Sequence, residues 1–176
     1  MLLLIDLQRA IDHPGWGIRN NPDAEKTVAD LLAHWRGKKW PVIHVRHDSK
    51  YPTSPYFPGQ SGNDFKPETA PLRGEDIIVK RTNSAFIDTD LEARLRRYPA
   101  LVVAGVITNN SVEATVRMAG NLGFDTWLVE DASFTFGRKD WDGVWRSAQE
   151  IHAVSLANLD GEYCTVIRSD GLLPRG

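Results

Sequence analysis

The sequence has very little cysteine and no long hydrophobic run. Cys164 is the single cysteine among 176 residues, so no intramolecular disulfide and no thiolate metal cluster can form. A reducing, cytoplasmic location is therefore expected. The apolar segment at the N-terminus extends over only five residues before Asp6 interrupts it. That length is too short for a signal peptide or a membrane span, so no membrane partner is expected.

An excess of charge of either sign is also missing. The formal net charge is −2, from 21 Lys and Arg residues and 23 Asp and Glu residues. This balance leaves no basic footprint for nucleic acid, and no such partner is expected. The apolar share of 41% and the charged share of 25% are typical of a globular protein. The chain is long enough for one sizeable core, which predicts a single domain over residues 1–176.

What the sequence does contain is an alternation of β-rich runs and helix-patterned segments. Helices are predicted from residues 21–22 to Gly37, from a capping box at 89–92 to about Leu95, over about 111–123, and from Trp141 to about Leu156. Trp35, Trp141 and Trp145 are interpreted as packing residues on helical faces. Six strands are predicted, at residues 1–5, 41–46, 76–80, 100–105, 124–130 and 163–168. Several are continuous apolar runs, which indicates an α/β fold with a parallel sheet.

One segment interrupts this alternation. Residues 47–75 contain five prolines and three glycines and show no strand or helix pattern. A loop of that length is uncommon in a compact domain and is usually functional or mobile. We expect it to cover a substrate or to contact another subunit, although an inert excursion is the alternative.

Three polar residues are predicted to lie at one edge of the sheet. Asp6 follows the first strand, Lys80 ends the third, and Ser111 comes just after the fourth. Ligands of open parallel sheets bind beyond the carboxyl ends of the strands. Each residue also has a structural interpretation: a paired carboxylate, a surface lysine and a helix N-cap. Together they favour a desolvated acid–amine pair next to a hydroxyl. Backbone N–H groups near that hydroxyl could hold a developing oxyanion. The motifs GxSxG, GxGxxG, HExxH and the P-loop are absent.

The sequence around these residues resembles the isochorismatase-like hydrolases, a family of cysteine hydrolases. The resemblance is carried by LLLIDLQ, VKRTNSAFIDTDLEARL, VVAGVITNNSVEATVRMAGNLGF, LVEDA and HAVSLANLDGEY, which together span almost the whole chain. It implies a three-layer α-β-α, Rossmann-like fold whose six parallel strands follow the order 3-2-1-4-5-6. It also implies catalytic roles for Asp6, Lys80 and the nucleophile position. That position holds Ser111 where the family has a cysteine.

The resemblance carries further expectations about the site. It implies a cis peptide bond between Val106 and Ile107, and an oxyanion hole made by the backbone N–H groups of Ile107 and Ser111. The family tends to form dimers or tetramers, so a homo-oligomer is expected. No cofactor is expected, and no metal, because the sequence at 48–50 (Asp-Ser-Lys) lacks the histidine of metal-dependent relatives. The candidate contacts for a small-molecule substrate are His47, Phe86, Asn110 and Phe134.

Three functional hypotheses follow from these observations. The first is a hydrolase of a small amide or related C–N bond, in which Ser111 is the native nucleophile or an engineered replacement of a cysteine. The second is a hydrolase of a vinyl ether of the isochorismate type, in which Asp6 donates a proton and no nucleophile is needed. The third is a degenerate homologue that binds a metabolite or a protein partner without turnover.

Overall fold

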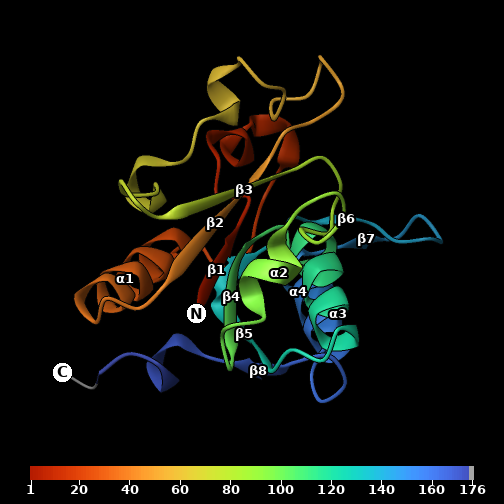
Figure 1. The fold of residues 1–176 in the computed structure, drawn as a ribbon. Coiled ribbons are helices and arrows are strands. Elements are labelled where there is room, and N and C mark those ends of the chain that lie inside the picture. Colours follow the sequence, from red (N-terminus) through yellow and green to blue (C-terminus); the bar gives the residue numbers. More distant parts are fainter. Residues whose placement is uncertain (175–176) are drawn as a thin grey trace.

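The centre of the fold is a parallel sheet of six strands (Figure 1). The computed structural model describes residues 1–174 and places these strands in the order β3-β2-β1-β4-β5-β8. Because β8 is the sixth strand of this sheet along the chain, the predicted order 3-2-1-4-5-6 is confirmed. The strands are β1 (Leu2–Ile5), β2 (Val42–His47), β3 (Asp76–Lys80), β4 (Leu101–Val106), β5 (Thr126–Phe134) and β8 (Thr165–Ile167).

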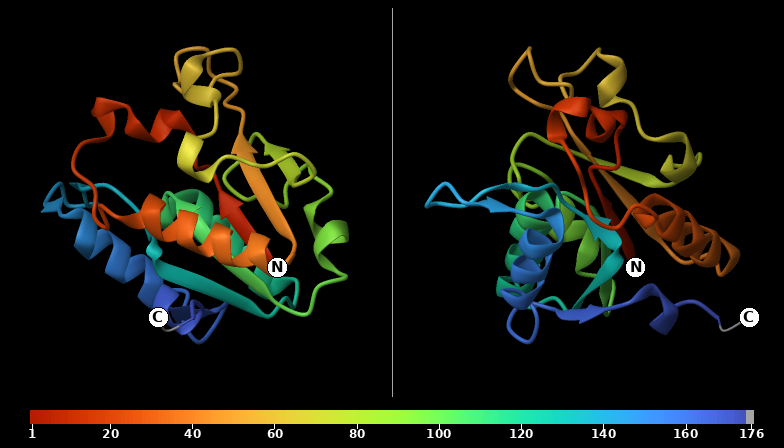
Figure 2. Two further views of the ribbon diagram at one scale, coloured as in Figure 1. Left: turned by 90° about the vertical axis from the view of Figure 1, so that its left-hand side faces the viewer. Right: turned by 180° about the vertical axis from the view of Figure 1, so that it is seen from behind.

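Helices cover both faces of this sheet, which confirms the three-layer prediction (Figure 2). On one face, α1 (Ala24–Gly37) packs on Leu2 and Leu4 of β1. On the other face, α2 (Leu91–Leu95) and α3 (Glu113–Asn121) pack on Leu3 and Ile5. Successive side chains of a strand point to opposite faces, so β1 contributes alternately to the two cores. The last long helix, α4 (Ala148–Ala157), lies beside α3.

The strands β1 and β4 approach each other closely at their carboxyl ends, where the strand order reverses. Gly105 pairs with Ile5 and has a φ of 127°. A Cβ atom at position 105 would lie 2.2 Å from the carbonyl oxygen of Ile5. Only glycine therefore fits here, for both its backbone angle and the space available. This contact holds the ends of β1 and β4, and the loops that follow them, side by side.

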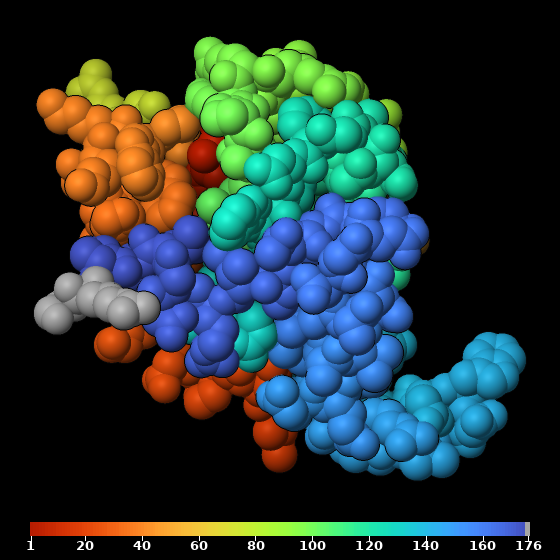
Figure 3. Space-filling model, turned by 90° about the horizontal axis from the view of Figure 1, so that it is seen from below, coloured from red at the N-terminus to blue at the C-terminus, as the bar shows by residue number. Residues whose placement is uncertain are grey.

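The segment between β5 and α4 differs from the prediction. It forms a hairpin of β6 (Arg138–Lys139) and β7 (Trp145–Arg146), and α4 begins only after Ser147. Trp141 is fully exposed and Trp145 is 63% exposed, so the prediction that both pack on a helical face is wrong. Figure 3 shows the hairpin projecting from the body of the molecule.

The physical reason lies in two local signals. Gly143 adopts a φ of 81° in the hairpin turn, and Ser147 forms a complete capping box with Glu150. A capping box fixes the start of a helix, so the helical pattern cannot extend back to Trp141. Trp35 is buried on α1, as predicted. At α2 no side-chain hydrogen bond caps the N-terminus at Asp90, although the hydroxyl of Thr89 accepts from the backbone N–H of Leu91.

The long loop of residues 47–75 lies over the carboxyl edge of the sheet (Figure 1). It contains the short 3-10 helices η3 (Ser61–Asn63) and η4 (Pro67–Thr69), and it packs near η1 (Arg9–Asp12) and η2 (Pro14–Trp16), which follow β1. A last 3-10 turn, η6 (Ser169–Gly171), follows β8. Among residues 1–174, no helix has the length and apolar character needed to cross a membrane.

Candidate active site

A small cavity of about 150 Å³ lies at the carboxyl ends of β1, β2 and β4. The segments that follow these strands, together with parts of the long loop and of η2, form its wall. Several of the predicted site residues meet there with others that the sequence did not indicate. The lining residues are Asp6, Trp16, His47, Ser54, Tyr56, Asn83, Val106, Ile107, Asn110 and Ser111.

Asp6 and Lys80 form a buried ion pair beneath this cavity. Their side chains are 5% and 0% exposed, and Lys80 Nζ lies 2.6 Å from Asp6 Oδ2. Asp6 turns the chain at the end of β1 with a φ of 53°, a left-handed conformation that aspartate tolerates. Its second oxygen, Oδ1, is buried and has no hydrogen-bond partner within the described residues. The pair is electrically balanced, and one of its acceptors remains available.

Ser111 is the third residue of this cluster. Lys80 Nζ donates a hydrogen bond to Ser111 Oγ over 3.2 Å, and the serine is buried. Ser111 lies in a π-helical turn, Thr108–Val112, immediately before α3. The structure shows no side-chain capping bond at the start of that turn or of α3. Its hydroxyl is therefore directed to Lys80 and the cavity, and the N-cap interpretation does not hold.

The turn after β4 presents backbone groups to the same cavity. The peptide bond between Val106 and Ile107 is cis, and both residues line the cavity. The next side chain, Thr108, is fully buried, and its hydroxyl lies 2.9 Å from Nδ1 of His152 on α4. Burial lowers the pKa of His152 to about 4, so its imidazole is neutral at pH 7. α4 thus supports the turn that carries Ile107.

The predicted substrate contacts divide into two groups. His47 and Asn110 line the cavity. Phe134 does not, because it is fully buried in the core, where its ring packs on Phe136 and lies under the guanidinium of Arg19. β5 extends four residues further than predicted and carries Phe134 into the core. Phe86 stacks on Phe124 and is likewise not among the residues that line the cavity within 1–174.

Four lining residues had no individual signal in the sequence. Ser54 and Tyr56 belong to the loop of residues 47–75, for which a covering role was one of the expectations. Trp16 and Asn83 lie on other loops, and Trp16 is fixed by a hydrogen bond from its indole N–H to the carbonyl of Ala10. No periodic pattern covers these segments, so only the tertiary fold brings them together.

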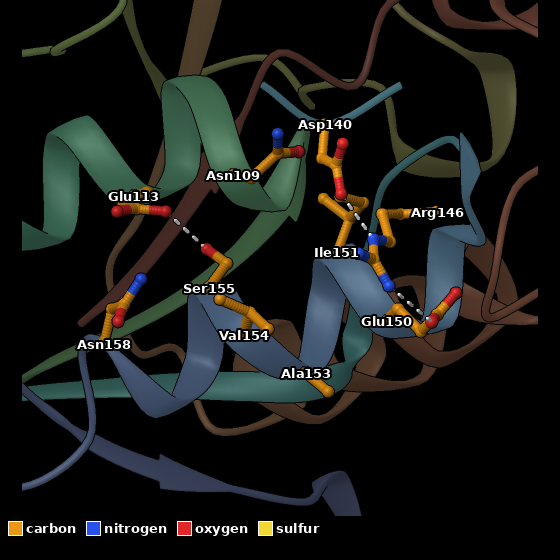
Figure 4. A pocket seen from close by; sticks show the side chains of 10 residues that line it. All are labelled: Asn109, Glu113, Asp140, Arg146, Glu150, Ile151, Ala153, Val154, Ser155 and Asn158. Carbon is orange, nitrogen blue, oxygen red and sulfur yellow. Dashed lines mark hydrogen bonds and ion pairs between the residues drawn. The ribbon is translucent and has the colours of Figure 1, made fainter. Parts of the chain in front are cut away.

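A groove of about 600 Å³ runs along the outer side of α4 (Figure 4). It is larger than the cavity, but its charged side chains are paired with one another or with neighbouring residues. Arg146 pairs with Asp140, and Ser155 donates to Glu113, as the dashed lines in Figure 4 show. Elsewhere Asp48 is held by Arg46 and Asn63. Among residues 1–174 no three His, Cys, Asp or Glu side chains gather at one place as a metal site would require.

Comparison with known proteins agrees with this geometry. The isochorismatase domain matches residues 1–169, almost the full length of the chain. The chain belongs to the isochorismatase family. A solved structure from Chromobacterium violaceum, assigned to the hydrolases of this family, is 61% identical with a TM-score of 0.95 and covers 97% of this chain and 90% of its own.

Two curated relatives show the breadth of the isochorismatase family. The protein YrdC of Bacillus subtilis is 40% identical over 98% of this chain and 93% of its own. Nicotinamidase 3 of Arabidopsis thaliana is 27% identical over 97% of this chain and 85% of its own. The chain is thus an isochorismatase-family hydrolase.

Proposed function

We propose that this protein hydrolyses a small amide or a related C–N bond, and that Ser111 is the nucleophile. The observation that carries the proposal is the contact of one ammonium group, that of Lys80, with both Asp6 and Ser111 at the edge of a cavity. A buried acid, a buried cation and a hydroxyl on one cavity are the groups that acyl transfer needs. The nicotinamidase relative acts, by its name, on an amide.

The cavity suits a covalent mechanism in two steps. Ser111 Oγ attacks the carbonyl carbon, and the oxygen that becomes negative is held by backbone N–H groups, for which we propose those of Ile107 and Ser111. The amine leaves with a proton, and water then hydrolyses the acyl-enzyme to a carboxylic acid. The ammonium of Lys80, 3.2 Å from Oγ, stabilises the negative charge that develops on this oxygen.

The size of the cavity limits the substrate. A cavity of about 150 Å³ in a protein core holds a molecule the size of benzene. Trp16, His47 and Tyr56 give it aromatic walls, and Asn83 and Asn110 provide amide groups. We therefore propose that the group next to the scissile carbonyl is small, uncharged and no larger than a single ring.

A panel of single-ring and short aliphatic amides tests this function. The expected result is turnover by the protein and loss of turnover in Ser111→Ala, with higher turnover in Ser111→Cys because a thiol is a stronger nucleophile. An inert Ser111→Cys variant across the whole panel would overturn the proposal. Turnover that survives Ser111→Ala but not Asp6→Asn would instead favour vinyl-ether hydrolysis without a nucleophile. Binding of an amide without turnover would favour a degenerate homologue.

A further inference from the structure

The proton of the Ser111 hydroxyl needs an acceptor, and the contacts of Lys80 restrict which group can take it. An ammonium group has three protons and accepts none. Lys80 Nζ has four acceptors nearby, at 2.6 Å (Asp6 Oδ2), 3.1 Å (Thr82 O), 3.2 Å (Ser111 Oγ) and 3.4 Å (His47 Nδ1). The three shorter contacts can use the three protons. In the tautomer that carries its proton on Nε2, His47 Nδ1, the most distant of the four atoms, has a lone pair that can accept another proton.

The hydroxyl of Ser111 has one proton, which needs an acceptor of its own. Its oxygen accepts from Lys80, so its own proton must point to a different acceptor. Asp6 Oδ1 has no hydrogen-bond partner among the described residues, and His47 Nδ1, in the tautomer protonated at Nε2, is the second candidate acceptor beside this ammonium. A carboxylate has a reference pKa of about 3.9 and an imidazole about 6.5, so an imidazole is ordinarily the stronger base of the two groups.

The surroundings of His47 keep its ring in place. Its backbone N–H donates to Gln8 Oε1 over 2.7 Å, and its carbonyl accepts from the side-chain amides of Gln8 and Asn63. Its ring packs edge-on against Tyr56, with 5.5 Å between the ring centres. A base whose position is fixed before the substrate binds loses little entropy in the reaction.

We propose that His47 is the general base of this protein, a role that exists because the nucleophile is a serine. The inference rests on the proposed function. As Ser111 Oγ bonds to the carbonyl carbon, its proton moves to the imidazole of His47, directly or through one water. The C–N bond then breaks, and the imidazolium returns this proton to the departing nitrogen. Water attacks the acyl-enzyme in the same way, so His47 ends the cycle neutral.

The charge state of His47 fits this role. Burial, and after it the positive charge of Lys80, hold the pKa of His47 below its usual value of 6.5. The carboxylates of Asp6 and Asp48 and a hydrogen bond to the backbone of Thr82 oppose them. The other titratable neighbour is Tyr56, whose phenol stays protonated because burial raises its pKa well above 10. The base form is therefore present at pH 7. The acylation rate should rise with pH through a midpoint below 6.5 and then stay level.

With a serine as the nucleophile, acylation should depend strongly on the imidazole of His47, and with a cysteine in its place it should not. A thiol, with a reference pKa of about 8.5, can be ionised without a strong base, whereas an alcohol cannot. Removal of the imidazole should therefore be costly with Ser111 in place and much less costly with a cysteine there. This difference separates a base from a residue that only supports the cavity, because a structural defect would affect both nucleophiles alike.

The test compares His47→Asn in the natural background and in Ser111→Cys, with 4-nitrophenyl acetate as the probe and the acylation rate as the readout between pH 5 and 9. We expect His47→Asn to slow acylation of Ser111 by about 100- to 1,000-fold, a typical general-base contribution, and to remove the midpoint below pH 6.5. In Ser111→Cys the same change should cost less than about tenfold. His44→Gln is the matched control, since His44 lies on the same strand but pairs with Glu75 outside the cavity.

Equal losses in both backgrounds, or an unchanged pH profile in His47→Asn, would overturn the role of His47 and leave the proposed function standing. Peptide mapping of the adduct makes the two failures distinguishable. If neither Ser111 nor the cysteine in its place becomes acylated, the proposed function fails together with this inference.

Discussion

The groove beside α4 and the cavity at the strand ends differ in size and in the state of their charges. The groove measures about 600 Å³ and the cavity about 150 Å³. In the groove, Arg146 is 44% exposed and pairs with Asp140 in contact with water. Beneath the cavity, the side chain of Lys80 is fully buried, and Asp6, which lines the cavity, has an oxygen without a partner among the described residues. Buried polar groups cost free energy unless they are paired, and their concentration at the smaller cavity is the reason that we assign the proposed reaction to it.

The helix α4 connects the two regions. Its outer side, with Val154 61% exposed, lines the groove. Its inner side carries His152, which holds Thr108 in the turn next to the cavity. Substitutions on the inner side of α4 should therefore affect stability and hydrolysis more than substitutions on its outer side. Variants of matched size can measure this difference.

The largest effect is expected from Lys80→Met. It leaves the carboxylate of Asp6 buried without its cation, which costs about 3–5 kcal/mol of the free energy of unfolding. Hydrolysis should fall to background, because Ser111 also loses its contact with the ammonium. Urea unfolding and an amide assay measure the two effects. The matched control is Arg146→Met in the groove, where an exposed pair should cost no more than about 1 kcal/mol. Equal losses for the two variants would contradict the comparison.

The second effect concerns the close approach of β1 and β4. Gly105→Ala places a methyl group 2.2 Å from the carbonyl oxygen of Ile5. The strands must separate, and we expect a loss of about 2–4 kcal/mol, as for a severe overpacking. Thermal unfolding checks this value. Gly143 in the hairpin turn also has a positive φ, of 81°, but a Cβ there would have no atom within 4 Å, so Gly143→Ala should cost only about 1 kcal/mol. A Gly105→Ala variant as stable as Gly143→Ala would show that the strands can move apart freely.

A smaller loss in the free energy of unfolding, which depends on pH, is expected for His152→Gln. The pKa of His152 is about 4 in the folded protein and near 6.5 in an unfolded chain, so the unfolded state binds more protons between these values. Stability should therefore decrease as the pH falls from 6.5 towards 4. His152→Gln should remove this component and, by weakening the bond to Thr108, cost about 1 kcal/mol at pH 7. Unfolding at several pH values checks both. An unchanged slope in the variant would mean that other groups cause the acid dependence.

The smallest effect is expected in the groove itself. Val154→Ser removes an exposed apolar side chain that supports neither the cavity nor the turn. Stability should change by less than about 0.5 kcal/mol, and hydrolysis by less than twofold. A loss of turnover in this variant would show that the groove takes part in the reaction. The homo-oligomer and the cytoplasmic location expected from the sequence stay predictions, and sedimentation of the same variant measures the subunit number.

The strands of the sheet and the meeting of three polar residues at its edge could be predicted from the sequence. Buried parallel strands are recognisable as short apolar runs, the strand order was implied by the family resemblance, and ligands of such sheets bind at the carboxyl ends of the strands. Asp6, Lys80 and Ser111 could therefore be predicted to meet. Tyr56 and Trp16 could not, because they lie in segments whose course depends on the rest of the fold.

Two predictions failed because a local pattern was given too much weight. The spacing of Trp141 and Trp145 imitates a helical face, but the capping box of Ser147 and Glu150, also present in the sequence, begins the helix later. Phe134 was placed at the site because β5 was predicted to end at residue 130. Its burial in the core shows that the strand continues to residue 134.

The most direct test of the central claim is where an acyl group becomes attached. The protein is mixed with 4-nitrophenyl acetate, quenched and analysed by intact mass and peptide mapping, with Ser111→Ala as the control. The account predicts one acetyl group on Ser111, absent in Ser111→Ala. Acetylation of the natural protein and of Ser111→Ala to the same extent, or at other residues only, would contradict it.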